Sequence, residues 1–128
     1  MYTLFYIDDD LTAATQSLGQ LNKDFSTIHA TTQQLRLETL ENAKPDAILF
    51  DYFTAAEAER TRELLKHFTG VHGVPLILLS AAPQLELYSK LFAFDGCIEK
   101  QNNYSLIRNS VMQFFSREKI IDPRGYSI

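Results

Sequence analysis

The stretch LFYIDDD, residues 4–10, decides the fold, because four apolar or aromatic residues run directly into three aspartates. An unbroken apolar run of this length is typical of a β-strand that is covered on both faces. Neighbouring carboxylates repel one another, so three of them directly after a buried strand need a positive partner or a capping role. The stretch therefore predicts a parallel sheet with an acidic group at the carboxyl end of its first strand.

The composition of the chain suits one globular domain. The chain has 128 residues, of which 45% are hydrophobic and 22% are charged, and its net charge is −4. This length allows a substantial core, and the acidic balance argues against a nucleic-acid partner, which needs a basic face. A single cysteine, Cys97, excludes an internal disulfide and suits a reducing cytoplasm. The apolar runs are too short to span a bilayer and the N-terminus lacks a secretory signal pattern, so we expect a cytoplasmic protein without a membrane contact.

Short apolar runs alternate along the chain with longer segments of helical spacing. This alternation indicates βαβ units, and therefore an α/β fold with five parallel strands and helices on both faces of the sheet. In the first helix, Leu11, Ala14, Leu18 and Leu21 are expected to form one buried stripe. The expected strands are residues 3–7, 25–30, 46–50, 74–79 and 96–99, and the expected helices are residues 11–23, 32–43, 55–68, 84–94 and 103–118.

Polar residues stand at the carboxyl ends of the strands, where ligands bind in a doubly wound sheet. Two acids from the first strand and one from the third suit a hard cation, and Mg²⁺ fits best, because it takes carboxylates together with water and phosphate oxygens. A lysine and a serine hydroxyl at neighbouring strand ends suit an added phosphoryl group. Together these groups predict phosphoryl transfer with an aspartyl-phosphate, whereas one aspartate is expected to cap the first helix. The residues are Asp8, Asp9, Asp51, Ser80 and Lys100, with Asp10 as the cap.

These strand ends resemble the receiver domain of two-component response regulators, the CheY-like domain of phosphorelay signalling. The matching stretches are the acidic pair in YIDDD, the aspartate that ends KPDAILFD, the hydroxyl residue in VPLILLSA and the lysine in DGCIEK. The resemblance implies a flavodoxin-like (βα)5 fold whose five-stranded parallel sheet has the order 2-1-3-4-5. It divides the chain into a receiver domain of residues 1–119 and a short tail of residues 120–128.

The resemblance implies roles for the acidic residues. Asp51 corresponds to the phosphoacceptor, and Asp9 corresponds to a direct ligand of Mg²⁺ with Asp8 beside it. The carboxylate of Asp51 and the backbone carbonyl of Phe53 would complete the protein's share of the metal shell. In the family, a histidine kinase or a histidine phosphotransfer protein donates the phosphoryl group, so these proteins are the implied partners.

The resemblance also implies roles for the other strand ends, with several departures. Ser80 and Lys100 would stabilise the phosphoryl group, and Ser80 would be the hydroxyl of the conformational switch. The second switch position usually holds an aromatic residue and here holds Cys97. Phe53 places a large side chain beside the acceptor, and Gln101 replaces a proline that is common in the family. These departures leave open a pseudo-receiver, a protein-interaction module of the same fold that acts without phosphorylation.

Two further alternatives concern enzymes and contacts. A phosphatase with an aspartate nucleophile usually has a second aspartate two residues later, where this chain has Phe53. The segment LELYSKLFAF, residues 85–94, is apolar nearly all round. Because the fourth helix, the fifth strand and the fifth helix form the usual signalling face of receivers, this segment indicates a homodimer or effector contact, and the plain alternative is a deeply buried helix.

Overall fold

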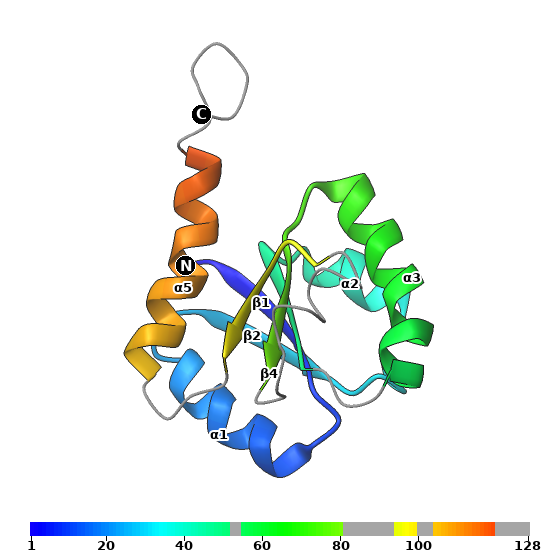
Figure 1. Ribbon diagram of the computed structural model, residues 1–128, viewed down its shortest axis with the longest axis horizontal. Coiled ribbons are helices and arrows are strands. Elements are labelled where there is room, and N and C mark those ends of the chain that lie inside the picture. Colours follow the sequence, from blue (N-terminus) through cyan, green and yellow to red (C-terminus); the bar gives the residue numbers. More distant parts are fainter. Residues whose placement is uncertain (52–54, 81–93, 100–103, 120–128) are drawn as a thin grey trace.

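The computed structural model describes residues 1–51, 55–80, 94–99 and 104–119 (Figure 1). Within these ranges, five strands form one parallel sheet in the order β2-β1-β3-β4-β5. This order confirms the expected fold class. The strands are β1 (Thr3–Ile7), β2 (Ser26–Ala30), β3 (Ala47–Phe50), β4 (Leu76–Ser80) and β5 (Gly96–Glu99), and the helices are α1 (Leu11–Leu21), α2 (Leu37–Ala43), α3 (Ala55–His72) and α5 (Tyr104–Lys119).

The sheet is covered by helices on both faces. Figure 1 shows α1 and α5 on one face, and α2 and α3 on the other. Successive side chains of a strand point to opposite faces, so β1 contributes to both cores. Leu4 and Tyr6 belong to the core under α1 and α5, whereas Phe5 and Ile7 belong to the core under α2 and α3. All four side chains are fully buried, which explains why the apolar run that opens the chain is unbroken.

The second helix is shorter than expected, because α2 begins at Leu37 and not at residue 32. The residues before it form a turn in which the backbone N–H of Leu35 donates to the carbonyl oxygen of Thr31, at 3.1 Å. The hydroxyl of Thr31 also accepts from the backbone N–H of Gln34, at 3.2 Å. Such side-chain to backbone bonding is how threonine competes with helix formation. The expected helical conformation of residues 32–36 is therefore wrong.

The third helix is longer than expected. It continues past residue 68 to His72 and ends where Gly73 takes a φ of 68°. This left-handed conformation is common at the end of a helix, and glycine adopts it without a steric penalty. The helix expected at residues 84–94, apart from Phe94, and the tail of residues 120–128 lie outside the described ranges.

The first helix buries most of the expected stripe, with one exception. Ala14 and Leu21 are buried, whereas Leu11 is 63% exposed. Leu11 is the first residue of α1, directly after the cap, and it belongs to neither core. The expected cap itself is confirmed, because the carboxylate of Asp10 accepts from the backbone N–H of Ala13 at 3.1 Å. None of the helices in the described ranges has the length and apolar character needed to cross a membrane.

Candidate functional site

The ends of β1 and β3 bring two aspartates to neighbouring positions. The register pairs Ile7 with Phe50, so the next residues along the two strands are Asp8 and Asp51. The backbone N–H of Asp51 donates to the carbonyl oxygen of Ile7 at 2.8 Å, which continues the ladder past the strands. Asp8 is fully buried and Asp51 is 7% exposed. Adjacent strands lie about 4.8 Å apart, so carboxylates at these two positions can contact one ligand.

The buried carboxylate of Asp8 accepts hydrogen bonds on both of its oxygens. The phenol of Tyr6 donates to Oδ2 at 2.9 Å, and the backbone N–H of Asp10 donates to Oδ1 at 2.9 Å. Nε2 of His29 lies 2.9 Å from the carbonyl oxygen of Asp8, and because a carbonyl oxygen only accepts, this nitrogen carries the hydrogen. Buried polar groups are stable when they are hydrogen-bonded, so these contacts fix Asp8 at the end of the sheet.

The carboxylate of Asp9 contacts the loop that follows β2. Oδ1 accepts from the backbone N–H of Thr32 at 2.6 Å, and Oδ2 accepts from the hydroxyl of Thr32 at 2.8 Å. Because β2 pairs with one edge of β1 and β3 pairs with the other, Thr32 and Asp51 lie on opposite sides of Asp9. This pair of hydrogen bonds, here called the Thr32 clasp, joins Asp9 to the loop on the β2 side of β1.

The donor chemistry of this end of the sheet suits a magnesium ion, because carboxylate oxygens are the ligands that Mg²⁺ prefers in proteins. The arrangement of the donors is incomplete, since no group of three His, Cys, Asp or Glu side chains in the described part of the chain is placed to hold a metal ion. Asp9, one of the three expected carboxylates, is hydrogen-bonded to Thr32 in the loop after β2.

The remaining expected site residues are only partly described. Ser80 is the last residue of β4, and its backbone pairs with Glu99 at the end of β5. Phe53 and Lys100 lie outside the described residues. Cys97 is half-buried and packs against the core under α2 and α3.

Sequence reasoning did not identify three residues that surround the acidic pair, namely Tyr6, His29 and Thr32. A signal exists for Tyr6, because it stands two residues before Asp8 and alternate residues of a strand share a face. Thr32 and His29 carry no such signal. Thr32 is 23 positions away from Asp9 along the chain, and its contact depends on the parallel pairing of β1 with β2.

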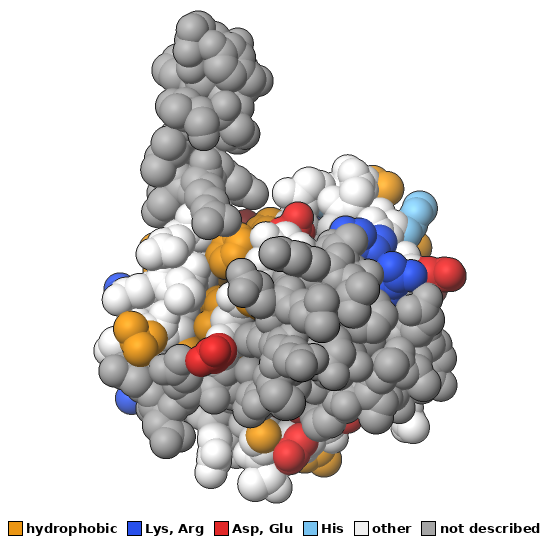
Figure 2. All heavy atoms as spheres, in the orientation of Figure 1, with side chains coloured by type: hydrophobic (Ala, Val, Ile, Leu, Met, Phe, Trp, Pro, Cys, Tyr) orange, Lys and Arg blue, Asp and Glu red, His pale blue; other side chains and the backbone are white. Residues whose placement is uncertain are grey.

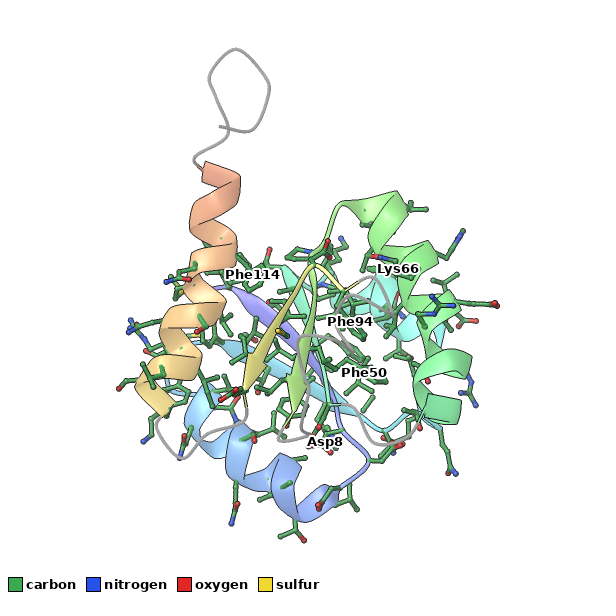
Figure 3. All side chains as sticks on the ribbon, in the orientation of Figure 1. Asp8, Phe50, Lys66, Phe94 and Phe114 are labelled. Carbon is green, nitrogen blue, oxygen red and sulfur yellow. The ribbon has the colours of Figure 1, made fainter. Side chains whose placement is uncertain are left out.

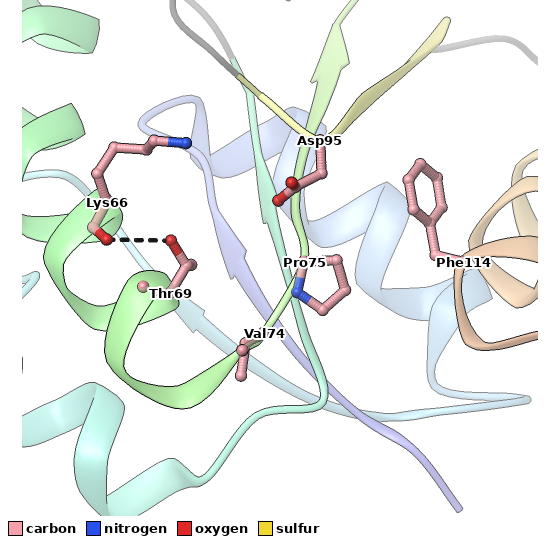
Figure 4. Close-up of a pocket in the computed structure, with 8 residues that line it drawn as sticks. Lys66, Thr69, Val74, Pro75, Asp95 and Phe114 are labelled. Carbon is pink, nitrogen blue, oxygen red and sulfur yellow. Dashed lines mark hydrogen bonds between the residues drawn. The ribbon is translucent and has the colours of Figure 1, made fainter. Parts of the chain in front are cut away.

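A hollow of about 510 Å³ lies at the other end of the strands (Figure 4). Its polar groups bond to the protein backbone: the carboxylate of Asp95 accepts from the N–H of Leu76 at 2.7 Å, and the hydroxyl of Thr69 donates to the carbonyl oxygen of Lys66 at 3.3 Å. Figure 3 shows Lys66 and Asp8 at opposite ends of the sheet. The hollow is therefore separate from the acidic end, and Asp95 joins the start of β4 to the segment before β5.

The surface charge of the described residues is mixed. On the face drawn in Figure 2, Lys and Arg side chains gather over α3, with an acidic side chain beside them and further acidic groups elsewhere on the face. The whole chain carries a net charge of −4. A mixed surface of this kind differs from the basic stripe that nucleic-acid-binding proteins present.

Comparison with known proteins identifies the fold through solved structures, since no protein-family model and no curated protein matches the sequence. The signal receiver domain of a signal transduction histidine kinase from Syntrophus aciditrophicus is 20% identical, with a TM-score of 0.74 and coverage of 96% of both chains. The BeF3-activated N-terminal receiver domain of RstA from Klebsiella pneumoniae is 17% identical, with a TM-score of 0.69 and coverage of 87% of this chain and 96% of that chain.

A third similar structure is the chemotaxis protein CheY4 from Vibrio cholerae, which is 16% identical, with a TM-score of 0.69 and coverage of 88% of this chain and 98% of that chain. All three are similar over nearly their full length. The chain therefore has the flavodoxin-like fold of CheY-like receiver domains, as the strand-end residues indicated.

Proposed function

We propose that this protein is a response-regulator receiver that accepts a phosphoryl group on Asp51, with the receiver domain formed by residues 1–119. The observation that carries the proposal is that Asp8 and Asp51 lie side by side, directly after the paired residues Ile7 of β1 and Phe50 of β3. Ligands of doubly wound sheets bind at such a carboxyl end. The receiver fold of the chain supports the same function.

In the proposed reaction, a carboxylate oxygen of Asp51 attacks the phosphorus atom of a phosphohistidine. The O–P bond forms while the N–P bond breaks, and the leaving imidazole keeps the electron pair and takes up a proton. The donor is a histidine kinase or a histidine phosphotransfer protein. The product places phosphoryl oxygens beside the buried carboxylate of Asp8, so this end of the sheet needs positive charge.

A magnesium ion and Lys100 would supply that positive charge. When bound, Mg²⁺ offsets the charge of the phosphoryl oxygens. Ser80 ends β4, the neighbour of β3, so its hydroxyl would donate to a phosphoryl oxygen from that side. The proposed metal ligands are the carboxylates of Asp8, Asp9 and Asp51 and the backbone carbonyl of Phe53.

The proposed output is a protein contact on the face formed by residues 84–94, β5 and α5. Leu106 of α5 is 51% exposed, so this helix offers an apolar group to a partner. The partner is an effector or a second copy of the chain. Cys97 lies on β5, and in this proposal it stands at the second switch position. A cytoplasmic location is part of the proposal, because a chain with one cysteine suits a reducing compartment.

A pseudo-receiver is the second candidate, and a specific observation favours it. The Thr32 clasp holds Asp9, and among the described residues no three acidic, histidine or cysteine side chains are placed to hold a metal. A domain that kept this arrangement permanently would bind its partner without phosphorylation. The two candidates differ in whether Asp51 reacts.

Intact-mass spectrometry after incubation with acetyl phosphate and Mg²⁺ distinguishes them. We expect one phosphoryl adduct on the wild-type protein and none on Asp51→Asn. Removal of Mg²⁺ with a chelator should also abolish the adduct. A matched control is Asp46→Asn, because Asp46 precedes the opposite end of β3 and its carboxylate accepts from the backbone N–H of Thr3 at 2.7 Å. Absence of an adduct on the wild type, together with absence of Mg²⁺ binding, would favour the pseudo-receiver.

A further inference from the structure

We propose that Thr32 regulates the metal site, because the Thr32 clasp and a bound cation compete for the carboxylate of Asp9. This inference rests on the proposed function, since it concerns occupation of the same site. Three features of the structure carry it: the bonding of Asp9, the position of Thr32 relative to Asp51, and the turn that holds Thr32.

The clasp occupies each oxygen of the Asp9 carboxylate. The distances of 2.6 Å to the backbone nitrogen and 2.8 Å to the hydroxyl oxygen of Thr32 are short, as expected for hydrogen bonds to a charged acceptor. Both residues are half-buried, so water competes less for these groups than on an open surface. A cation that takes Asp9 as a ligand would therefore compete with contacts that are already favourable.

The sheet places the clasp and the acceptor on opposite sides. Ile7 pairs with Ala30 of β2 and with Phe50 of β3, so β1 lies between the two strands. Asp9 is two residues past Ile7 and Thr32 is two residues past Ala30, which puts the clasp at one level of the ladder. A cation shared with Asp51 lies on the β3 side. The oxygens of Asp9 that accept from Thr32 are the same two that a cation on the β3 side would take, so in this proposal the cation draws Asp9 away from Thr32.

The turn that presents Thr32 is held by its own contacts. Thr31 accepts from Gln34 through its hydroxyl, at 3.2 Å, and its backbone N–H donates to Oε1 of Gln34 at 3.0 Å. Leu35 is buried in the core, which fixes the far end of the turn. The turn therefore stays in place when Asp9 leaves. Binding of the cation is then weakened by the free energy of the two hydrogen bonds between Asp9 and Thr32.

Calorimetric titration with Mg²⁺ alone tests this competition. Thr32→Val removes the hydroxyl and keeps the shape and the backbone N–H, and we expect it to bind Mg²⁺ about tenfold more tightly than the wild type, since a hydrogen bond to a charged group is lost. Thr32→Ser restores the hydroxyl and should bind like the wild type. Thr31→Val is the matched control, because its hydroxyl bonds within the turn, and we expect it to leave the affinity unchanged.

A second readout uses the wild-type protein and is independent of any variant. On saturation with Mg²⁺, the backbone amide of Thr32 loses its carboxylate acceptor. We expect its ¹H–¹⁵N nuclear magnetic resonance signal to move by more than that of Gln34, whose acceptors lie within the turn. An unmoved Thr32 signal with the metal bound would overturn the proposal.

The outcomes separate the clasp from the function on which it rests. If Thr32→Val binds Mg²⁺ as tightly as the wild type or more weakly, and the wild type binds it normally, the proposed competition for Asp9 is overturned. The proposed role of Asp51 as phosphoacceptor is not affected by that result. Absence of Mg²⁺ binding in all variants overturns the clasp and the proposed metal site together. The phosphoryl adduct on Asp51 reports the proposed function separately.

Discussion

Asp8 lies fully buried directly after β1, and Tyr6 is buried beside it. The hydroxyl of Tyr6 donates a hydrogen bond to Oδ2 of Asp8. In an apolar interior, an acceptor that loses its donor cannot turn to water. Tyr6 therefore contributes to the stability of the acidic pair as well as to the core under α1 and α5.

We expect Tyr6→Phe to lower the free energy of unfolding by about 1–2 kcal/mol, because the buried carboxylate of Asp8 loses a hydrogen bond. Urea denaturation measures the change. In an Asp8→Ala background the same substitution should cost less, since the acceptor is already absent. Equal costs in the two backgrounds would show that the hydroxyl acts through another contact.

The acidic residues show what a sequence reveals about a site and what it leaves out. Asp8 and Asp51 could be predicted as neighbours, because parallel strands present their carboxyl ends at one edge of the sheet. The orientation of Asp9 could not be predicted. It depends on the register of β1 with β2 and on the turn of residues 31–35, where apolar spacing indicated the start of a helix.

At the scale of elements, β5 and α5 fit together through the smallest side chain of β5. A Cβ atom placed on Gly96 would collide with the ring of Phe114 in α5. The ring thus fills space that any other residue at position 96 would need. This contact sets how closely α5 approaches the edge strand of the sheet.

We expect Gly96→Ala to lower the free energy of unfolding by about 1–3 kcal/mol, because the added methyl group displaces the ring of Phe114. Thermal denaturation checks this. A matched control is Gly19→Ala, because Gly19 lies in α1 with open space around it. This variant should have a free energy of unfolding about 0.5–1 kcal/mol higher than the wild type. If Gly96→Ala costs as much in a Phe114→Leu background, the collision is not the cause.

The elements were largely predictable and their ends were not. Five apolar runs identified all five strands within about two residues, as expected where patterning decides the element. The helix ends depend on local hydrogen bonds and backbone conformation that spacing does not encode. Thr31 forms hydrogen bonds within a turn, so α2 begins later in the sequence than expected. The helix α3 continues until Gly73, which has a left-handed conformation.

At the scale of the whole molecule, a polar contact joins the last described helix to the first half of the fold. The phenol of Tyr104 in α5 donates to Oδ2 of Asp24 at 2.8 Å, and Nε of Arg108 lies 3.2 Å from Oδ1 of Asp24. Asp24 precedes β2, so the contact closes the layer formed by α1 and α5. Burial raises the pKa of Tyr104 above its ordinary value of 10.0, and its hydrogen bond to Asp24 adds to the shift.

This shift predicts a pH dependence of stability. In the unfolded chain, Tyr104 loses its proton near pH 10, whereas in the folded chain it keeps the proton to a higher pH. The unfolded state therefore binds fewer protons above this pH, and the free energy of unfolding falls as the pH rises. Tyr104→Phe should lower the free energy of unfolding by about 1 kcal/mol at neutral pH. The difference in this free energy between the variant and the wild type should become smaller toward about pH 11. A difference that stays constant over this range would contradict the link to Tyr104.

The central position of β1 has a consequence for communication across the molecule. A carboxylate that serves two neighbours in turn links them thermodynamically, and such a link acts equally in both directions. Consider a protein that binds residues 31–35 and keeps Thr32 hydrogen-bonded to Asp9. It would weaken the affinity of the site for the cation, and the cation would weaken the affinity for that protein by the same factor. The surface beside α2 would then sense the state of an acceptor that it does not touch.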